Sequence, residues 1–228
     1  MAFAASALFD ILLPRICPGC DCKLTAEERF VCNDCLNKIE MVNSESQHYN
    51  FAKIFIPKKF VTGFIALYHF EKDKELQKII HALKYNQKFL LGIFLGEMLG
   101  QTYQNLFNDW KIDLILPVPL HHIKKAERGY NQSQFIVKGI NKVLNTDVKV
   151  NILRRKRFTQ SQTHLNQHER EENVCGAFGV KNPKYITGKS ILVIDDVITT
   201  GATINECAKV LLDNGALKVY SASVAIAD

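Results

Sequence analysis

The sequence contains no uncharged apolar run that approaches the roughly 20 residues of a membrane span. It also lacks the marks of a secretory signal, because no basic residue precedes the apolar N-terminal stretch and Asp10 interrupts that stretch. No internal repeat or low-complexity tract is present. These absences argue against membrane, secreted and repeat proteins. We therefore expect a cytoplasmic protein whose 228 residues form one substantial domain and a small appendage.

The most distinctive segment runs from Ile191 to Thr203, where an apolar run meets two acids and then a loop of threonine and glycine. The four apolar residues 191–194 favour a strand that is buried on both faces of a parallel sheet. Asp195 and Asp196 are expected to leave that strand. Paired carboxylates can accept hydrogen bonds from ribose hydroxyls or approach a hydrated Mg²⁺ ion. The sequence therefore predicts a ligand site at the carboxyl end of this strand.

The loop after the two acids has the chemistry of a phosphate site. Glycine lets the backbone come close to a ligand, and the neighbouring hydroxyl groups can donate hydrogen bonds. A helix expected from Thr203 to about Asp213 would present its free N–H groups at the same place, which favours an anion. An alternative is that the acids only cap this helix, but a cap needs one carboxylate. The expected phosphate-binding residues are Thr199, Thr200, Gly201, Ala202 and Thr203.

The N-terminal part of the chain carries two Cys-x-x-Cys pairs, which are formed by Cys17, Cys20, Cys32 and Cys35. Each pair can direct two thiolates at one ion, and two pairs complete the tetrahedral sulfur shell of a structural Zn²⁺. Cys22 leaves an alternative open, because it could replace Cys17 or Cys20 or remain free beside the site. A disulfide framework is the competing interpretation, and the lack of secretory features argues against it.

The residues before the cysteines predict an amphipathic helix, because one helical face would collect Phe3, Ala7, Leu8, Ile11 and Leu12. We expect this helix to pack against the zinc module, and docking to a membrane or a partner is the alternative. The predicted organisation is a helix and zinc-ribbon-like module over 1–40, a linker over 41–59 and the main domain over 60–228.

Basic residues are concentrated in the middle of the chain. Between His121 and Arg170, eleven Lys and Arg oppose three Asp and Glu, in a chain whose net charge is +6. This concentration implies an anionic partner. A pyrophosphate needs a few cations near the site, whereas a nucleic-acid backbone needs a longer basic track, preferably with aromatic side chains. The candidate nucleic-acid-binding residues are Arg154, Arg155, Lys156 and Arg157.

Hydrophobic periodicity predicts alternating strands and helices in the main domain. Strands are expected at 60–70, 112–118, 152–153, 178–180, 190–194 and 218–225. Helices are expected at 74–84, 89–107 and 131–144, in addition to the one after the phosphate loop. The segment 154–174 has no clear periodicity and is expected to be a polar insertion that acts as a lid. This alternation predicts an open α/β sheet with its ligand at a topological switch point.

Together these motifs resemble the ComF/ComFC competence family. The segment 191–203 resembles the 5-phosphoribosyl-1-pyrophosphate (PRPP) motif of type I phosphoribosyltransferases. The other segments that carry the resemblance are the cysteine pairs, Pro117–Leu120, Arg128–Ser133, Thr159–Gln162 and Arg170–Phe178. The resemblance implies a type I phosphoribosyltransferase-like fold, with an open, mainly parallel sheet flanked by helices and a small zinc-ribbon-like head. It also implies PRPP with Mg²⁺ as ligand and a link to uptake and processing of single-stranded DNA.

The resemblance also implies roles for individual residues. Asp195 and Asp196 match the positions expected at the ribose hydroxyls, and Val118 and Pro119 fall where the pyrophosphate loop lies. Arg128 falls in a flexible hood, where it would be a third catalytic residue. A surface cation or a DNA contact is an equal alternative for Arg128.

Two functions are consistent with these motifs. One is a competence factor that binds PRPP and single-stranded DNA, and the other is an active phosphoribosyltransferase of nucleotide metabolism with no DNA role. We do not expect glutamine-dependent transfer, because the sequence begins Met1-Ala2-Phe3 without a cysteine nucleophile and leaves no room for a glutaminase domain.

Overall fold

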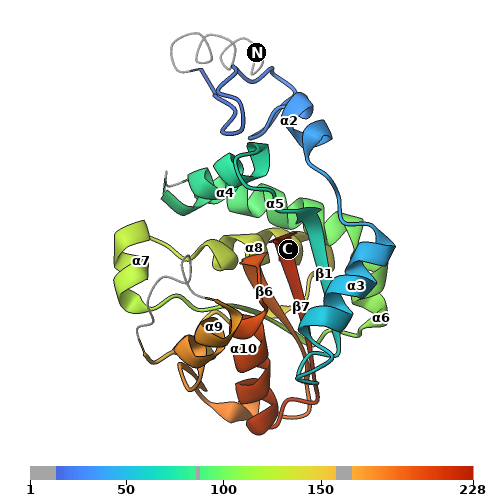
Figure 1. Cartoon of the computed structure of the whole chain (residues 1–228), viewed down its shortest axis with the longest axis vertical. Helices are drawn as coiled ribbons and strands as arrows, with labels where there is room; N and C mark the ends of the chain where they lie inside the picture. The colour runs from blue at the N-terminus through green and yellow to red at the C-terminus, as the bar shows by residue number, and fades with distance from the viewer. Residues whose placement is uncertain (1–13, 86–87, 158–165, 228) are drawn as a thin grey trace.

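The structure is a computed structural model that describes residues 14–85, 88–157 and 166–227 (Figure 1). The predicted N-terminal helix and the Thr159–Gln162 motif lie outside the described residues. Five parallel strands form the main sheet in the order β1-β7-β6-β2-β3. Their bounds are β1 Gly63–His69, β2 Leu114–Pro117, β3 Asp147–Val148, β6 Ser190–Ile198 and β7 Lys218–Ile226. The predicted open, parallel α/β sheet is confirmed.

A separate antiparallel pair is formed by β4 Leu153–Arg155 and β5 Phe178–Val180. The helices of the N-terminal half are α2 Asn33–Lys38, α3 Ser44–Ile54, α4 Glu75–Tyr85, α5 Phe89–Thr102 and α6 Gln104–Asp109. Those of the C-terminal half are α7 His122–Arg128, α8 Gln132–Leu144, α9 Gln167–Val174, η2 Pro183–Tyr185 and α10 Ala202–Asp213. The single helix predicted over 89–107 is therefore two helices. The short β3 and α7 were not predicted, because neither is long enough to show a hydrophobic period.

Apolar side chains cover both faces of the sheet, as expected for a parallel sheet. Alternation along β6 sends Leu192 and Ile194 into one cluster, with side chains of α4, α5 and α8. Ile191 and Val193 join the second cluster, with side chains of α10, β4 and β5. The sheet is thus the middle layer between two groups of helices (Figure 1).

Strand β6 is longer than predicted, because it extends beyond residue 194 to Ile198. Asp195 and Asp196 lie inside the strand, because β6 pairs with β7 up to Ile198. On its other side, β6 pairs with β2 only as far as Ile194, which lies opposite Pro117. The two acids therefore have a strand neighbour on one side only, because β2 ends before it reaches them.

The segment predicted as a linker, 41–59, contains helix α3. The Asn43 side chain caps the helix by accepting a hydrogen bond from the Ser46 N–H group at 2.9 Å. Gln47 then exchanges hydrogen bonds with the backbone of Ala66 in β1, at 2.6 and 3.0 Å. The polar residues that suggested a linker are a helix cap and a tertiary contact.

The cysteine-rich segment packs against helix α4. Cys17, Cys32 and Cys35 are buried in the same apolar cluster as Leu76 and Leu83 of that helix. Figure 1 shows α2 and the neighbouring loops at the top of the molecule, on the side of the sheet that carries α4 and α5. The small module therefore extends one face of the main domain.

The segment 154–174, predicted to be a polar insertion, begins in β4 and ends in helix α9. Asn166 and Glu169 form a reciprocal capping box at the start of that helix. The helix was not predicted because seven of its eight residues are polar and it lacks an apolar period. Within the described ranges, no helix has the length and apolar character needed to cross a membrane.

Candidate functional site

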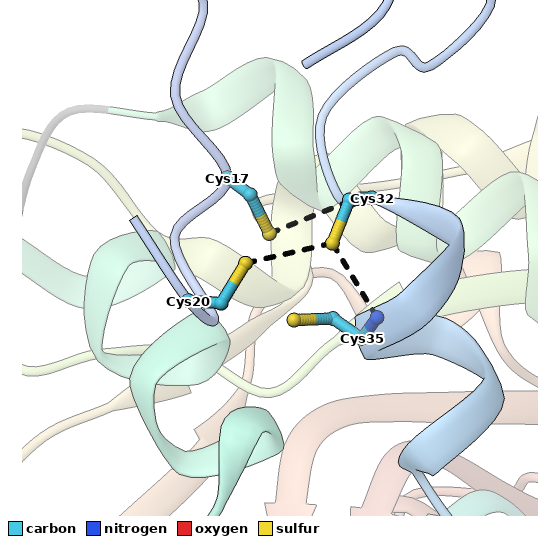
Figure 2. A group of neighbouring side chains, drawn as sticks. All are labelled: Cys17, Cys20, Cys32 and Cys35. Atoms are coloured by element: carbon cyan, nitrogen blue, oxygen red, sulfur yellow. Dashed lines mark hydrogen bonds between the residues drawn. The ribbon is translucent and has the colours of Figure 1, made fainter. Parts of the chain in front are cut away.

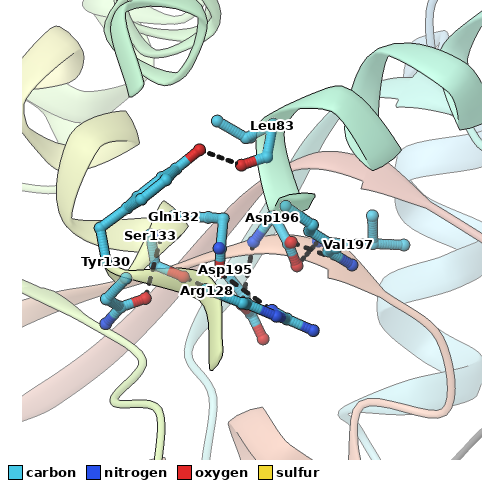
Figure 3. A network of polar contacts seen from close by, with 10 residues as sticks. Leu83, Arg128, Tyr130, Gln132, Ser133, Asp195, Asp196 and Val197 are labelled. Carbon is cyan, nitrogen blue, oxygen red and sulfur yellow. Dashed lines mark hydrogen bonds and ion pairs between the residues drawn. The ribbon is translucent and has the colours of Figure 1, made fainter. Parts of the chain in front are cut away.

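Strand alternation turns the two acidic side chains of β6 to different sides. The Asp195 Oδ1 atom accepts a hydrogen bond from the Ser133 hydroxyl at 3.1 Å. The Asp196 Oδ2 atom lies 3.0 Å from the Nζ atom of Lys84, which comes from α4. Figure 3 shows Ser133, at the start of α8, beside Asp195 of β6. Two helices and one strand therefore meet at the predicted carboxylate site.

The two acids differ in their electrostatic surroundings. Burial and the charge of Asp196 together raise the pKa of Asp195 from 3.8 to about 7, while the Asp196 N–H group, Lys84 and Ser133 act in the opposite direction. Asp196 is 8% exposed and keeps the cation of Lys84 as its partner. Near neutral pH, Asp195 is therefore able to hold or release a proton.

Lys84 was not predicted as a site residue. It stands in the last turn of α4, whose apolar face packs on the sheet face toward which Asp196 points. Beside it, the carbonyl oxygen of Leu83 accepts a hydrogen bond from the Tyr130 hydroxyl. No pattern in the sequence marks Lys84 beyond its place in a predicted helix, because the contact depends on how α4 crosses the sheet.

Arg128 lies at the same site and is held there by two contacts. Its Nη1 atom donates a hydrogen bond to the Gln132 Oε1 atom at 3.0 Å. Its guanidinium lies 5.3 Å from the centre of the Tyr85 ring. Arg128 ends α7 and Gln132 begins α8, so the short turn between these helices brings a cation and an amide to the carboxylates (Figure 3).

The predicted phosphate loop joins β6 to α10. Gly201 has a left-handed backbone with φ of 69°, and α10 begins at the next residue without a side-chain cap among the described residues. A Cβ atom on Gly201 would lie 2.2 Å from the Ile54 Cγ2 atom of α3. Position 201 therefore requires glycine for both its conformation and its close contact. The structure brings the first N–H groups of α10 to the end of the carboxylate strand.

Two further contacts connect the loops around the carboxylates. The Arg170 Nη1 atom of α9 donates a hydrogen bond to the Thr199 hydroxyl oxygen at 2.9 Å. The Val118 N–H group donates to the Ile194 carbonyl at 2.8 Å, and the Val118 carbonyl accepts from the Asn131 side chain at 2.9 Å. The predicted pyrophosphate segment, which continues into Pro119, therefore lies directly beside β6 and the start of α8.

The four basic residues 154–157 differ in their contacts, and all but Arg155 are exposed. Arg154 and Lys156 are exposed, whereas Arg155 is half-buried and lies 5.3 Å from the Phe178 ring centre. Burial lowers the pKa of Arg155, while Cys207 and Asp195 act in the opposite direction. Arg157 donates hydrogen bonds to the backbone carbonyls of Asn173, in the last turn of α9, and of Cys175, at 3.1 and 2.9 Å. Two of the four side chains are thus engaged with the protein itself.

The four predicted metal ligands come together in the N-terminal module (Figure 2). The Sγ atoms of Cys17, Cys20, Cys32 and Cys35 all lie within 4.8 Å of one another, and the four cysteines are free thiols. Backbone N–H groups approach the Sγ atoms of Cys17 and Cys32 at 3.4 Å, contacts that stabilise thiolate ligands. Cys22 is exposed and lies outside the cluster. The cluster can hold one metal ion such as zinc.

A cavity of about 480 Å³ lies elsewhere, between the cysteine module and the start of α5. Ile16, Leu24, Phe30 and Phe89 are among its lining residues, whereas Asp195 and Asp196 are not. Its lining also contains Arg15, Arg29 and Lys88 but none of the predicted ligand-binding residues, so the carboxylates and their cations define the candidate site.

Residues 81–227 match the family model of the phosphoribosyl transferase domain. Among curated proteins, the chain is 30% identical to competence protein F of Haemophilus influenzae, over 60% of this chain and 61% of that protein. It is 30% identical to DNA utilization protein YhgH of Escherichia coli, over 63% of this chain and 64% of that protein. The chain thus spans just under two thirds of the length of these relatives. Competence protein ComFC of Streptococcus pneumoniae is 27% identical, over 95% of this chain and 83% of that protein.

Among solved structures, the chain is similar to the allosteric regulatory enzyme of purine biosynthesis, at 20% identity and a TM-score of 0.39. That similarity covers 58% of this chain and 25% of the other. The match to the domain model includes β2, β6, the phosphate loop and α10, which are the elements that build the site. The chain belongs to the phosphoribosyl transferase domain family, and its relatives there are the ComF-type competence proteins.

Proposed function

We propose that this protein binds PRPP with Mg²⁺ at the carboxyl end of β6. The observation that carries the proposal is the direct succession, within one connection, of two acids and an uncapped helix start. Asp195 and Asp196 directly follow the last residue of β6 that pairs with β2, and Gly201 precedes α10 a few residues later. A ligand with both sugar hydroxyls and a phosphate suits this arrangement, because carboxylates accept hydrogen bonds and helix N–H groups bind anions.

Each part of the site would have a separate role. Asp195 and Asp196 would accept hydrogen bonds from the ribose hydroxyls, and residues 199–203 would bind the 5-phosphate. Val118 and Pro119 would lie along the pyrophosphate. The carboxylate oxygens are hard ligands of the type that Mg²⁺ prefers, and the ion would offset the charge of the pyrophosphate.

Isothermal titration calorimetry with PRPP and Mg²⁺ tests this proposal. The unaltered protein is expected to bind, and the double variant Asp195→Asn, Asp196→Asn is expected to lose at least tenfold in affinity. Asp213→Asn, at the exposed end of α10, is the matched control and is expected to bind normally. Absence of heat with the unaltered protein would overturn the proposal.

We further propose that the protein handles single-stranded DNA. The support is that its relatives are named competence and DNA utilization proteins, and that Arg154 in β4 and Lys156, directly after β4, are both exposed cations. Phosphate contacts by such side chains predict binding that weakens steeply with salt. In mobility shifts at two salt concentrations, Arg154→Glu with Lys156→Glu is expected to weaken binding. The same reversal at Lys72 and Lys74, which are exposed before α4, is the control.

Phosphoribosyl transfer is the second candidate function, favoured by the domain match. In that reaction an acceptor lone pair would form a bond to ribose C1, while the C1–O bond breaks and its electron pair leaves with pyrophosphate. The C1 centre would be inverted, and the proton lost by the acceptor would go to a base; Asp195, with its pKa near 7, is suited to that role. Release of pyrophosphate from PRPP with ammonia or a nucleobase would support transfer. Binding of PRPP without release of pyrophosphate would argue against transfer and would leave the DNA-handling proposal unaffected.

We propose zinc as the metal of the four-cysteine cluster, since four thiolates form its usual structural shell. Free thiols are also consistent with a reducing compartment such as the cytoplasm.

A further inference from the structure

The side chain of Gln132 is buried with half of its amide unused. Gln132 is 1% exposed and is the first residue of α8. Among the described residues, its Nε2 atom has no hydrogen-bond partner. A buried donor without a partner is destabilising, and native proteins tend to retain such a group where a ligand uses it.

The orientation of this amide is fixed by its neighbour. Arg128 has only donor groups, so the Gln132 atom that it contacts at 3.0 Å must be the oxygen. The two N–H bonds of the amide therefore point away from Arg128. Figure 3 shows Gln132 and Arg128 beside the strand that carries Asp195 and Asp196. The unused donor belongs to the carboxylate site.

The surrounding charges indicate which acceptor the donor would meet. The guanidinium of Arg128 holds one end of the amide and lies over the Tyr85 ring. Lys84 precedes Tyr85 in α4. Arg128 and Lys84 are both cations. A ligand oxygen that enters between two cations and an amide donor is most strongly bound when it carries negative charge.

We propose that Gln132 is a binding residue for the pyrophosphate group of the ligand, and that Arg128 acts as its positioning residue. This inference rests on the proposed binding of PRPP. In it, the Gln132 N–H groups donate to a pyrophosphate oxygen, while Arg128 holds the amide oxygen and contributes positive charge. Gln132 then distinguishes ligands that carry pyrophosphate from those that carry only ribose and the 5-phosphate.

Calorimetry with three ligands and Mg²⁺ tests this proposal. Gln132→Met keeps the length of the side chain and removes the donor. It is expected to weaken binding of PRPP and of pyrophosphate about 10- to 100-fold, or about 1.4 to 2.8 kcal/mol, and to leave ribose 5-phosphate binding unchanged. Gln132→Glu is expected to weaken the first two further, because it places a carboxylate opposite the anion. Gln134→Met, two positions along α8 and half-buried, is the control.

Thermal stability separates a binding role from a structural one. Gln132→Met removes an unpartnered buried donor, which favours the folded state, but it also removes the oxygen that accepts from Arg128, so its melting temperature without ligand is expected to stay close to that of the unaltered protein. Equal loss of affinity for all three ligands would overturn the assignment to pyrophosphate, and unchanged affinity for PRPP would overturn the role of Gln132. An unaltered protein that binds neither PRPP nor ribose 5-phosphate would overturn the proposed function itself and this inference with it.

Discussion

Asp195 and Asp196 show how far two neighbouring identical residues can differ. The sequence singled out both as candidate site residues, because paired acids after an apolar run are an unusual pattern. It could not show that Asp195 would meet Ser133 while Asp196 would meet Lys84, because those contacts join segments about 60 and 110 residues apart. Single residues were thus predictable where they sit in a local motif, and their partners were not.

The raised pKa of Asp195 predicts how stability depends on pH. A carboxyl group whose pKa is higher in the folded state than in the unfolded state holds its proton more tightly when folded. Its contribution is present below about pH 4 and is lost as the pH rises toward 7. Between pH 5 and 7 the unfolding free energy of the unaltered protein, minus that of Asp195→Asn, is expected to fall, by at most about 1.4 kcal/mol per pH unit. Urea unfolding at several pH values measures this difference, and a difference that rises with pH would contradict the prediction.

The ion pair of Lys84 and Asp196 predicts a loss of stability when one partner is removed. Lys84→Met is expected to cost about 1 to 3 kcal/mol, because it leaves a nearly buried carboxylate without its cation. Lys78→Met, on the exposed face of the same helix, is expected to change the unfolding free energy by less than about 0.5 kcal/mol. In the double variant with Asp196→Asn, most of the cost of Lys84→Met is expected to disappear. Denaturant unfolding of the unaltered protein, Lys84→Met, Asp196→Asn and the double variant provides this cycle. Additive effects of the two substitutions would contradict the predicted ion pair.

Gly201 and Gly129 together separate two costs of replacing glycine. Both have left-handed backbones, with φ of 69° and 78°, but only Gly201 would place a Cβ atom against Ile54. Gly129→Ala is therefore expected to cost about 1 to 2 kcal/mol, and Gly201→Ala about 1 to 3 kcal/mol more. Adding Ile54→Ala is expected to restore part of the loss at position 201. Equal costs at the two glycines, measured by thermal unfolding, would show that α3 does not restrict the loop.

At the scale of elements, the hydrophobic period predicted the strands and the long helices well. It failed for α3 and α9, whose sequences are polar and which are held by caps and contacts with other elements. It also ended β6 too early, because two acids normally mark a strand end, whereas β7 continues to pair beside them. Local pattern therefore gave the type of most elements, and neighbouring elements decided their ends.

The cysteine module provides a prediction at the same scale. Cys20 and Cys22 are both exposed and two residues apart, but only Cys20 belongs to the cluster of four Sγ atoms. Protein purified without chelator is expected to contain one zinc per chain by mass spectrometry. Cys22→Ser is expected to keep that zinc and Cys20→Ser to lose most of it, because three thiolates leave the tetrahedral shell incomplete. Zinc loss in the Cys22 variant would require a different set of ligands.

At the scale of the whole molecule, the domain division predicted from the sequence suggests two bodies joined by a linker, whereas the structure shows a shared apolar core. Cys17 and Val31 of the module belong to the same cluster as Leu83 of α4 and Leu192 of β6. The sequence could not reveal this, because spacing identifies metal ligands but not the surface on which a small module packs.

Because the core is shared, removal of the metal is expected to lower the stability of the sheet as well as that of the cysteine module. Trp110 is the only tryptophan, and it stacks on Tyr220 of β7 at 4.6 Å, so its fluorescence reports on the main domain. A chelator is expected to lower the melting temperature seen by this signal, by about 2 to 4 °C for each kcal/mol lost. A Trp110 transition that does not move while the zinc leaves would mean that the module unfolds by itself.

The contact between Lys84 and Asp196 also has a consequence for how a ligand enters. Because this acid already has an internal counter-ion, a sugar hydroxyl that reaches it would either share the carboxylate with the ammonium group or displace that group. The displaced ammonium group stays on the end of α4, within reach of the negatively charged portion of the newcomer. Binding would then replace the ion pair between Lys84 and Asp196 with a new attraction between Lys84 and the ligand anion.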